Sequence, residues 1–301
     1  MDENKIDVSH LVPSAQKAAM LPDKERLQHI RADHWIGYTR ARAVLARLEE
    51  LFAWPTKLRM PNLLIIGPTN NGKSMIIEKF RRSHPVQSHA DFESIPVAVV
   101  QMPSEPSVAR FYGMLLAAIG APQRKSAKVA ELEQMAISLL RSVQARIIVI
   151  DEMHNLLASK KDAHREFLNL LRFLGNELRI PIIGVGTKDA YLAIRLDAQL
   201  ENRFEPEPLP VWEEGDELRS LLSSFSAAIP LRRPSEISSE EMSRYILSRT
   251  QGTIGEITKL LTTAAVLAIE TGEESINKQT LELASYHSPD ERRRMFERAL
   301  K

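Results

Sequence analysis

The clearest pattern in the chain is a series of short, almost wholly apolar runs, separated by longer stretches whose apolar residues recur three and four positions apart. A continuous apolar run rich in β-branched residues is typical of a strand that is buried on both faces of a parallel sheet. The longer stretches have the spacing of amphipathic helices. Because runs and stretches alternate, the pattern predicts a parallel sheet sandwiched by helices. The apolar runs are 62–66, 95–100, 146–150 and 180–187.

The helical spacing continues to the end of the chain, whereas the strand-like runs stop near residue 187. A proline cluster, Pro206, Pro208 and Pro210, marks the change, and we interpret it as a domain boundary. We therefore expect an N-terminal helical arm over 1–58, an α/β core over 59–210, and a small α-helical lid domain with a basic tail over 211–301. The helices we expect are 40–52, 75–82, 107–119, 129–144, 163–178, 240–249 and 254–270.

The segment between the first strand and its helix matches the phosphate-binding loop of P-loop NTPases. In such a loop the glycines let backbone N–H groups surround a phosphate chain, Lys73 reaches the β- and γ-phosphates, and the Ser74 hydroxyl binds Mg²⁺. The following helix directs its positive end at the same anion. The alternative is a glycine turn with a solvated lysine, and the flanking strand and helix disfavour it. The pattern predicts a site for ATP and Mg²⁺ made by Gly67, Pro68, Thr69, Asn70, Asn71, Gly72, Lys73, Ser74 and Met75.

Two acids, Asp151 and Glu152, follow the apolar run 146–150. In P-loop NTPases an acid at this point holds Mg²⁺, and a second acid beside it can polarise the water that attacks the γ-phosphate. We assign the metal role to Asp151, together with Ser74, and the catalytic base to Glu152. An apolar strand that ends in Asp-Glu is ordinary turn chemistry when it stands alone. Its order and spacing after the phosphate-binding loop favour the catalytic interpretation.

Composition and charge narrow the classes of function. The chain has 301 residues, of which 44% are hydrophobic and 26% charged, as in packed globular proteins. With 40 Lys and Arg against 39 Asp and Glu it is nearly neutral, so any nucleic-acid binding has to come from local patches. The absence of cysteine excludes disulfides and a cysteine nucleophile. No signal sequence and no membrane-length apolar run are evident, so we expect a cytoplasmic protein without a membrane partner.

Several strings in the chain resemble the TniB family of transposition ATPases, which are AAA+ relatives of the TnsC, MuB and IstB proteins. The phosphate-binding loop alone does not distinguish this family, but the strings together do. They are Arg59-Met60-Pro61-Asn62-Leu63-Leu64 before the loop, Asp151-Glu152-Met153-His154-Asn155-Leu156-Leu157, Phe173-Leu174-Gly175-Asn176-Glu177-Leu178, Gly184-Val185-Gly186-Thr187-Lys188-Asp189-Ala190, Gln199-Leu200-Glu201-Asn202-Arg203-Phe204 and Gly252-Thr253-Ile254-Gly255-Glu256-Ile257.

The resemblance implies an α/β P-loop NTPase of AAA+ type. It implies an ATPase that assembles on duplex DNA as a ring or helical filament, and that recruits or activates a DDE transposase of the TniA/TnsB type. ATP hydrolysis would drive disassembly, a TniQ-like targeting protein is a further possible partner, and the location is a bacterial cytoplasm, at the nucleoid.

Two polar residues acquire catalytic roles from the same resemblance. Arg203 resembles an arginine finger that a subunit supplies to its neighbour's γ-phosphate, and such fingers raise rates by about 10³–10⁵. Without the resemblance, a salt bridge from Arg203 to Glu201 or Glu205 is favoured. Thr187, after the run 180–187, resembles a sensor of the γ-phosphate. From the residues alone, a hydroxyl that caps the next helix is an equal alternative.

The chain departs from many AAA+ proteins where a lid arginine contacts the nucleotide, since Gly255 stands at that position. Lys259, one turn later, is better explained as a solvated helix lysine than as a substitute for the missing arginine. Slow hydrolysis, with ATP acting mainly as an assembly switch, is consistent with this departure.

DNA contact would need cations directed at phosphates, without base-reading motifs. The candidates are Arg124, Lys125 and Lys128, with Arg110 a weaker one, and each is also compatible with a solvated surface charge. The tail that contains Arg292, Arg293 and Arg294 is diluted by acids and fits a frayed helical terminus.

Two alternatives remain open at this point. One is a non-catalytic, ATP-bound DNA scaffold that only recruits transposase. The other is a replication ATPase similar to helicase loaders, which has the same fold. Replacement of Glu152 separates an active ATPase from a scaffold, because only the active enzyme needs the base.

Overall fold

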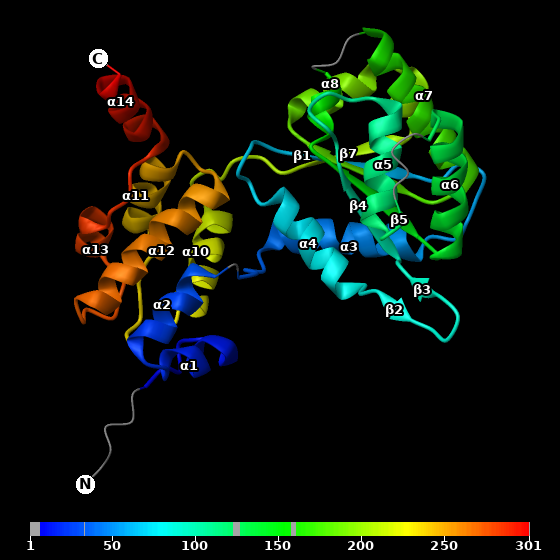
Figure 1. Cartoon of the computed structure of the whole chain (residues 1–301). Helices are drawn as coiled ribbons and strands as arrows, with labels where there is room; N and C mark the ends of the chain where they lie inside the picture. The colour runs from blue at the N-terminus through cyan, green and yellow to red at the C-terminus, as the bar shows by residue number, and fades with distance from the viewer. Residues whose placement is uncertain (1–6, 33, 123–126, 158–160, 301) are drawn as a thin grey trace. The chain divides into compact units, whose positions relative to one another are not determined.

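The computed structural model describes residues 7–32, 34–122, 127–157 and 161–300 of the chain, which form two compact units (Figure 1). One unit is the α/β unit, residues 43–210. The other is the helical unit, which combines the residues up to Arg42 with those from Val211 onward. The first helices of the chain therefore share a unit with the last ones, although nearly 170 residues separate them.

A parallel five-stranded sheet forms the centre of the α/β unit, with strand order β4-β5-β6-β1-β7. Residues of β1, β5 and β6 are buried on both faces of the sheet, as the apolar runs predict. The predicted parallel sheet with flanking helices is confirmed. The strands are β1 (Asn62–Ile66), β4 (Val97–Gln101), β5 (Ile147–Asp151), β6 (Ile182–Gly186) and β7 (Phe204–Pro208).

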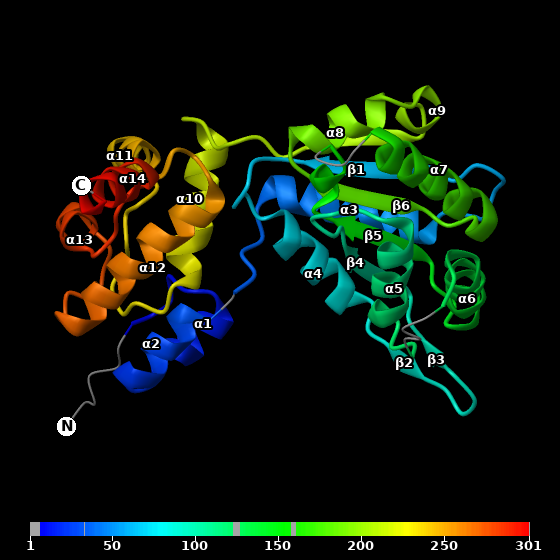
Figure 2. The same ribbon diagram turned by 45° about the horizontal axis from the view of Figure 1, so that its top comes forward.

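Helices cover the sheet and supply the rest of its core (Figure 2). Alternate strand residues such as Ala98, Val100, Ile148 and Ile150 share one apolar cluster with the inner faces of the helices after β4. The helices of this unit are α3 (Thr39–Ala53), whose residues up to Arg42 are counted with the helical unit, α4 (Lys73–Ser83), α5 (Val108–Ala118), α6 (Val129–Ser142), α7 (Lys161–Leu178), α8 (Lys188–Arg195) and α9 (Ala198–Glu201), with a 3-10 turn η1 (Met153–Leu156).

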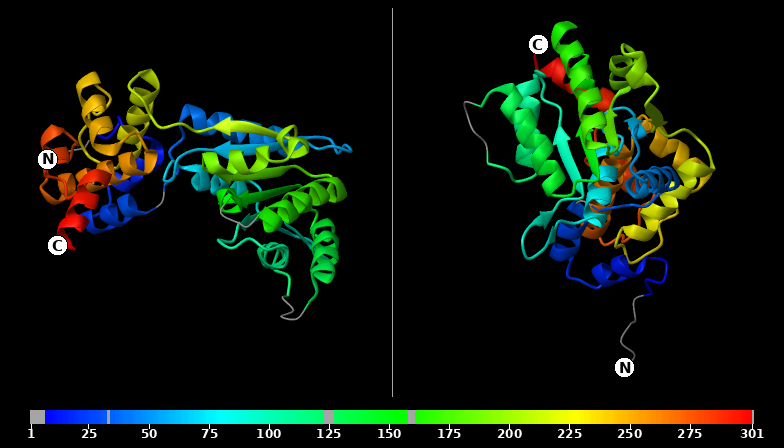
Figure 3. Two further views of the ribbon diagram at one scale, coloured as in Figure 1. Left: turned by 90° about the horizontal axis from the view of Figure 1, so that it is seen from above. Right: turned by 90° about the vertical axis from the view of Figure 1, so that its right-hand side faces the viewer.

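Strand β7 contains two of the three clustered prolines and was not expected from the sequence. Among the described residues it pairs only with β1, so it is an edge strand of the sheet. Pro206 and Pro208 are two positions apart, so their backbone nitrogens lie on the same side of the strand. An edge strand has one side without a neighbouring strand, and it therefore tolerates residues that cannot donate a ladder hydrogen bond. A small antiparallel hairpin, β2 (Gln87–Ser88) with β3 (Glu93–Ser94), projects from the unit (Figures 1 and 3).

The helical unit is built around α12, which packs against α2, α11 and α13. The buried Arg26 of α2 ties the first helices to this bundle, because its guanidinium donates to both carboxylate oxygens of Glu274 and to the carbonyl of Pro230. The helices are α1 (Pro13–Ala19), α2 (Asp23–Arg31), α10 (Asp216–Ala228), α11 (Glu240–Thr250), α12 (Ile254–Glu270), α13 (Lys278–Leu283) and α14 (Pro289–Ala299). Among the described residues no single helix has the length and hydropathy to cross a membrane, and only the bent pair α11 and α12 meets both criteria together.

Candidate functional site

The carboxyl ends of β1, β6 and β5 lie side by side, and the polar residues that follow them meet at one edge of the sheet. β1 leads into the loop 67–72, β6 into Thr187, and β5 into Glu152. Together with the start of α4 they enclose a cavity of about 230 Å³. Its lining residues are Thr69, Asn70, Asn71, Gly72, Lys73, Ser74, Met75, Glu152, His154 and Thr187.

The loop holds a left-handed turn that sets up the start of α4. Asn70 and Gly72 have φ angles of 60° and 82°, a region that asparagine tolerates and glycine adopts without strain. The Asn71 amide donates to the carbonyls of Leu209 and Pro210 at 2.8 and 3.0 Å, so it ties the loop to the end of β7. The loop and the N-terminus of α4 line the cavity, and a glycine-containing loop that leads into a helix N-terminus is the arrangement that accommodates phosphate groups.

Lys73 is buried and turns onto its own loop. Its Nζ donates to the carbonyl oxygens of Gly67 at 2.8 Å and Pro68 at 2.6 Å. Burial lowers the pKa of this ammonium, and the nearby carboxylates of Asp151 and Glu152 offset part of that effect. The positive charge thus lies at the base of the cavity, with two carbonyls as its partners.

The two predicted metal residues touch, although 77 positions separate them in the chain. The Ser74 hydroxyl donates to Asp151 Oδ2 at 2.8 Å, and Asp151 Oδ1 accepts the backbone N–H of Glu152 at 2.8 Å. A hydroxyl and a carboxylate are oxygen ligands of the kind that Mg²⁺ prefers. The donor set therefore fits a magnesium ion.

Glu152 lies beside a histidine that the sequence analysis did not single out. His154 Nε2 is 3.1 Å from Glu152 Oε2, and both side chains are partly exposed to the cavity. The other ring nitrogen, Nδ1, is buried and has no hydrogen-bond partner among the described residues. Glu152 has a φ angle of 55°, which turns the chain into η1 and brings His154 back toward it. The only sequence signal for this pair is a histidine two positions after the second acid.

Gly186, the last residue of β6, makes room for this histidine. A Cβ at this position would lie 2.8 Å from Ala190 Cβ and 3.2 Å from the backbone nitrogen of His154. Both distances are shorter than ordinary van der Waals contact. The next residue, Thr187, caps α8, and its hydroxyl accepts the Asp189 N–H at 3.4 Å while it also lines the cavity. The capping role and a place in the site are therefore compatible.

Arg203 lies at the end of the sheet where the strands begin, opposite the phosphate-binding loop. It directly precedes β7, in which Phe204 pairs with Asn62 at the start of β1. At about 3.3 Å per residue, the length of β1 puts it about 13 Å or more from the phosphate-binding loop of its own chain. Its guanidinium donates to the Asn176 side chain at 2.8 Å. The salt bridge to Glu201 or Glu205 is not formed, because these acids pair with Arg195 and Arg47 instead.

Two of the four candidate DNA cations lie within the described residues. Lys128 and Arg110 are exposed, the first just before α6 and the second in the first turn of α5. Arg124 and Lys125 lie outside the described residues.

In the helical unit, Arg292 donates to both carboxylate oxygens of the buried Glu256, so this part of the basic tail is engaged. Gly255 lies in the first turn of α12, directly before Glu256, and Lys259 is exposed.

Comparisons with known proteins agree with this architecture. The ORC1 protein of Aeropyrum pernix, in complex with DNA, has a TM-score of 0.60 at 17% identity over 85% of this chain and 67% of its own. The ORC2 protein of the same organism, in ADPNP and ADP complexes, has a TM-score of 0.58 at 15% identity, over 85% of this chain and 70% of its own. At these identities the likeness shows the fold alone, an AAA+ α/β fold with C-terminal helices.

No curated protein is similar to the chain at a significant level. The model of one protein family, the bacterial TniB protein, matches residues 26–214. This match spans the α/β unit, with its phosphate-binding loop and acidic strand end, and more than half of the whole chain. The protein therefore belongs to the TniB family.

Proposed function

We propose that the protein is an AAA+ ATPase that assembles on duplex DNA in its ATP-bound form and recruits or activates a DDE transposase. The observation that carries the proposal is the convergence of Lys73, the Ser74–Asp151 pair and Glu152 on one cavity. Membership of the TniB family supports the link to transposition. TniA/TnsB-type transposases and TniQ-like proteins are the partners we expect.

The residues of the cavity divide the work of ATP hydrolysis. Loop amides from Gly67 to Lys73 would hold the phosphates, and the Lys73 ammonium would exchange its carbonyl partners for phosphate oxygens. Ser74 and Asp151 would hold Mg²⁺, which supplies charge neutralisation at the phosphates when bound. Glu152 would take a proton from a water molecule beside the phosphates.

His154 acts as a positioning residue for Glu152. Its Nε2 lies 3.1 Å from Glu152 Oε2. This interaction would hold one carboxylate oxygen and leave the other for the water.

Arg203 would complete the site of a neighbouring subunit. Its position at the amino-terminal edge of the sheet keeps it from the nucleotide of its own chain, so catalysis would depend on assembly. Exposed cations such as Lys128 and Arg110 are candidates for phosphate contacts with DNA, and steep weakening of binding with salt is expected.

The decisive experiment is electron microscopy of the full chain with duplex DNA and a non-hydrolysable ATP analogue. Rings or filaments are expected for the natural chain and are expected to be lost in Lys73→Ala and Arg203→Ala, while a matched exposed-arginine control, Arg165→Ala, retains them. With ATP itself, Glu152→Gln is expected to accumulate the assembly that the natural chain dissolves. Equal persistence in both would favour the non-catalytic scaffold, and a monomer indifferent to nucleotide and DNA would refute the proposal.

A further inference from the structure

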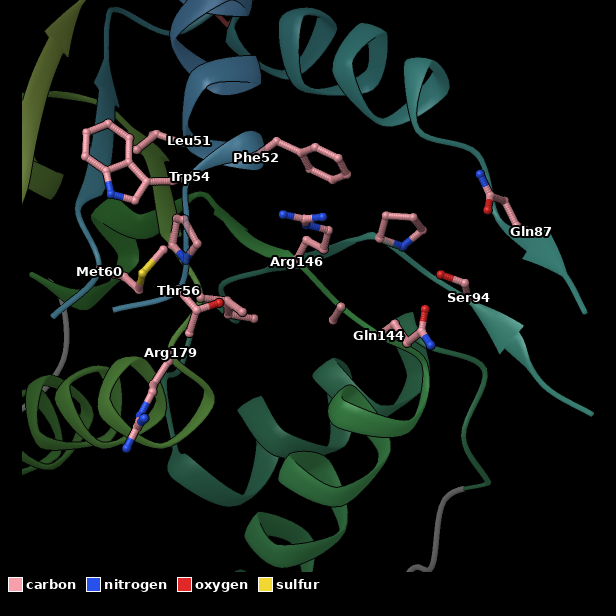
Figure 4. A pocket seen from close by; sticks show the side chains of 14 residues that line it. Leu51, Phe52, Trp54, Thr56, Met60, Gln87, Ser94, Gln144, Arg146 and Arg179 are labelled. Atoms are coloured by element: carbon pink, nitrogen blue, oxygen red, sulfur yellow. The ribbon is translucent and has the colours of Figure 1, made fainter. Parts of the chain in front are cut away.

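A second and larger hollow, of about 570 Å³, lies at the other end of the same sheet, where the strands begin (Figure 4). Its walls come from the end of α3 and from the residues that precede β1, β4, β5 and β6. The nucleotide cavity is formed by residues that follow strands, so the two sites are at different ends of the sheet. Neither ATP binding nor hydrolysis, as proposed above, uses this hollow.

Two aromatic residues and two arginines stand among its otherwise aliphatic and neutral polar lining. The guanidinium of Arg146 lies 5.1 Å from the ring centre of Phe52, and Arg179 lies at one end of the hollow with its side chain directed outward (Figure 4). Lys57, next to the hollow, places its ammonium 4.8 Å from the ring centre of Trp54. No acidic residue lines the hollow, and within the described part of the chain none of these cations has a carboxylate partner.

This combination favours an anionic ligand that also carries an apolar group. Unpaired guanidinium groups are suited to carboxylates and phosphates, which they bind with two parallel hydrogen bonds. The faces of Phe52 and Trp54 offer apolar area that a cation alone does not need. A volume within the usual range of ligand sites, about 300–1,000 Å³, accommodates both parts.

The helix ends at the hollow discriminate between a phosphate ligand and a peptide. α3, α6 and α7 all terminate there, and Trp54, Gln144 and Arg179, which follow these helices closely, line the hollow. Helix C-termini present carbonyl oxygens and the negative end of the helix dipole. A compact phosphate group would therefore find no helix N-terminus to hold it, whereas a peptide can place a carboxylate on a guanidinium group and an apolar side chain on the aromatic rings.

The shape of the hollow also suits an extended segment. Trp54, Met60 and Arg179 lie at one end, Gln87 and Ser94 at the other, with Phe52 and Arg146 between them (Figure 4). We propose that this hollow is a groove that binds an acidic, extended segment of a partner protein, with its carboxylates on Arg146 and Arg179 and a large apolar side chain against Phe52 and Trp54. The site would leave the nucleotide cavity accessible, so partner binding and ATP binding can occur together.

The test uses the full-length protein and a random dodecapeptide phage library as the probe. Selected peptides are expected to be enriched in Asp and Glu next to Leu or an aromatic residue. A labelled copy of the best peptide is then titrated by fluorescence anisotropy, and Arg146→Glu/Arg179→Glu is expected to weaken its binding at least tenfold. The matched control is Arg31→Glu/Arg165→Glu, which makes the same change of charge at exposed arginines elsewhere and is expected to bind as the natural chain does.

Two further measurements keep the test decisive. Arg146→Gln/Arg179→Gln removes the charge without reversing it, and its thermal melt shows whether a loss of binding reflects unfolding. Peptides without acidic enrichment, or binding that survives the paired substitution, would overturn the proposal. A single-stranded oligonucleotide that binds with the same dependence on Arg146 and Arg179 would assign the groove to nucleic acid and overturn it as well.

Discussion

The sharpest consequence of the site geometry concerns a residue that is neither in the phosphate-binding loop nor among the acids. If His154 positions Glu152, then His154→Leu, which keeps much of the volume but removes the ring nitrogens, should impair hydrolysis without impairing nucleotide binding. Its Nε2 lies 3.1 Å from Glu152 Oε2 and is the atom that faces the base. Its Nδ1 contributes no hydrogen bond within the described residues.

The magnitude follows from the exposure of the pair. Contacts between charged and polar groups at exposed positions contribute about 0.2–1 kcal/mol. The side chains of His154 and Glu152 are 27% and 38% exposed, so solvent competes for their contact and this range applies. Since 1.36 kcal/mol corresponds to a factor of ten in rate, we expect kcat to fall by up to about fivefold.

The assay is steady-state ATP hydrolysis of the assembled protein on DNA, combined with titration of a fluorescent nucleotide analogue. The Kd for the analogue is expected to stay within about twofold, because His154 has no part in holding phosphate. His154→Gln, whose amide can still donate to the carboxylate, should recover part of kcat. In the Glu152→Gln background His154→Leu should cause no further loss, because residues that act through one another are non-additive.

Three outcomes would contradict the reasoning. An unchanged kcat in His154→Leu would make the contact incidental, and a raised kcat would make it a restraint on Glu152 and not a support. A lowered melting temperature with unchanged kcat would assign His154 to packing alone. If Glu152→Gln itself hydrolyses ATP at the normal rate, the error lies in the proposed catalytic base and not in the role of His154.

Other features of the structure give predictions of their own. Gly186→Ala should destabilise the protein by about 1–3 kcal/mol in denaturant unfolding and reduce hydrolysis, because the added Cβ displaces His154; full activity would contradict this. Arg26→Met should cost about 1.5–3 kcal/mol, because the carboxylate of Glu274 loses two charged hydrogen bonds and keeps only its contacts with Arg232, whereas Arg26→Met/Glu274→Met should recover much of the loss. Burial by itself raises the pKa of Glu274 and of Glu256, but hydrogen bonds from guanidinium groups outweigh it and hold both below their usual 4.5. The stability they contribute is therefore complete above about pH 4.5 and is lost as the pH falls through the lowered values, so thermal melts should decline there, and less in Glu256→Gln.

Much of the fold was predictable because its signals are local. The apolar runs identify β1, β5 and β6 by their composition, and the alternation with helices implies parallel pairing. The phosphate-binding loop is a continuous segment whose turn depends on residues such as Asn70 and Gly72 in their own positions. The same is true of Asp151 and Glu152 at a strand end, and the fold and the family that these patterns indicated are confirmed.

The proline content of the edge strand β7 is a local signal that did not predict a strand. Proline disfavours a strand on average, so Pro206 and Pro208 indicated only a boundary. The missing N–H groups are tolerated because this segment lies at the edge of the sheet. Its position at the edge is a property of the packed sheet and not of the local sequence.

The remaining features depend on which distant segments pack together, and no short stretch of sequence encodes that. The contact of Ser74 with Asp151 spans 77 positions, and that of Arg26 with Glu274 spans 248. His154 became part of the site only because β5 lies beside β6, whose terminal glycine leaves space for the ring. The sequence by itself determined the strands, the helices and the phosphate-binding loop, because their signals lie in neighbouring residues. Only the tertiary structure decided the partners of each side chain and the groove at the far edge of the sheet, because those follow from the order in which the strands assemble.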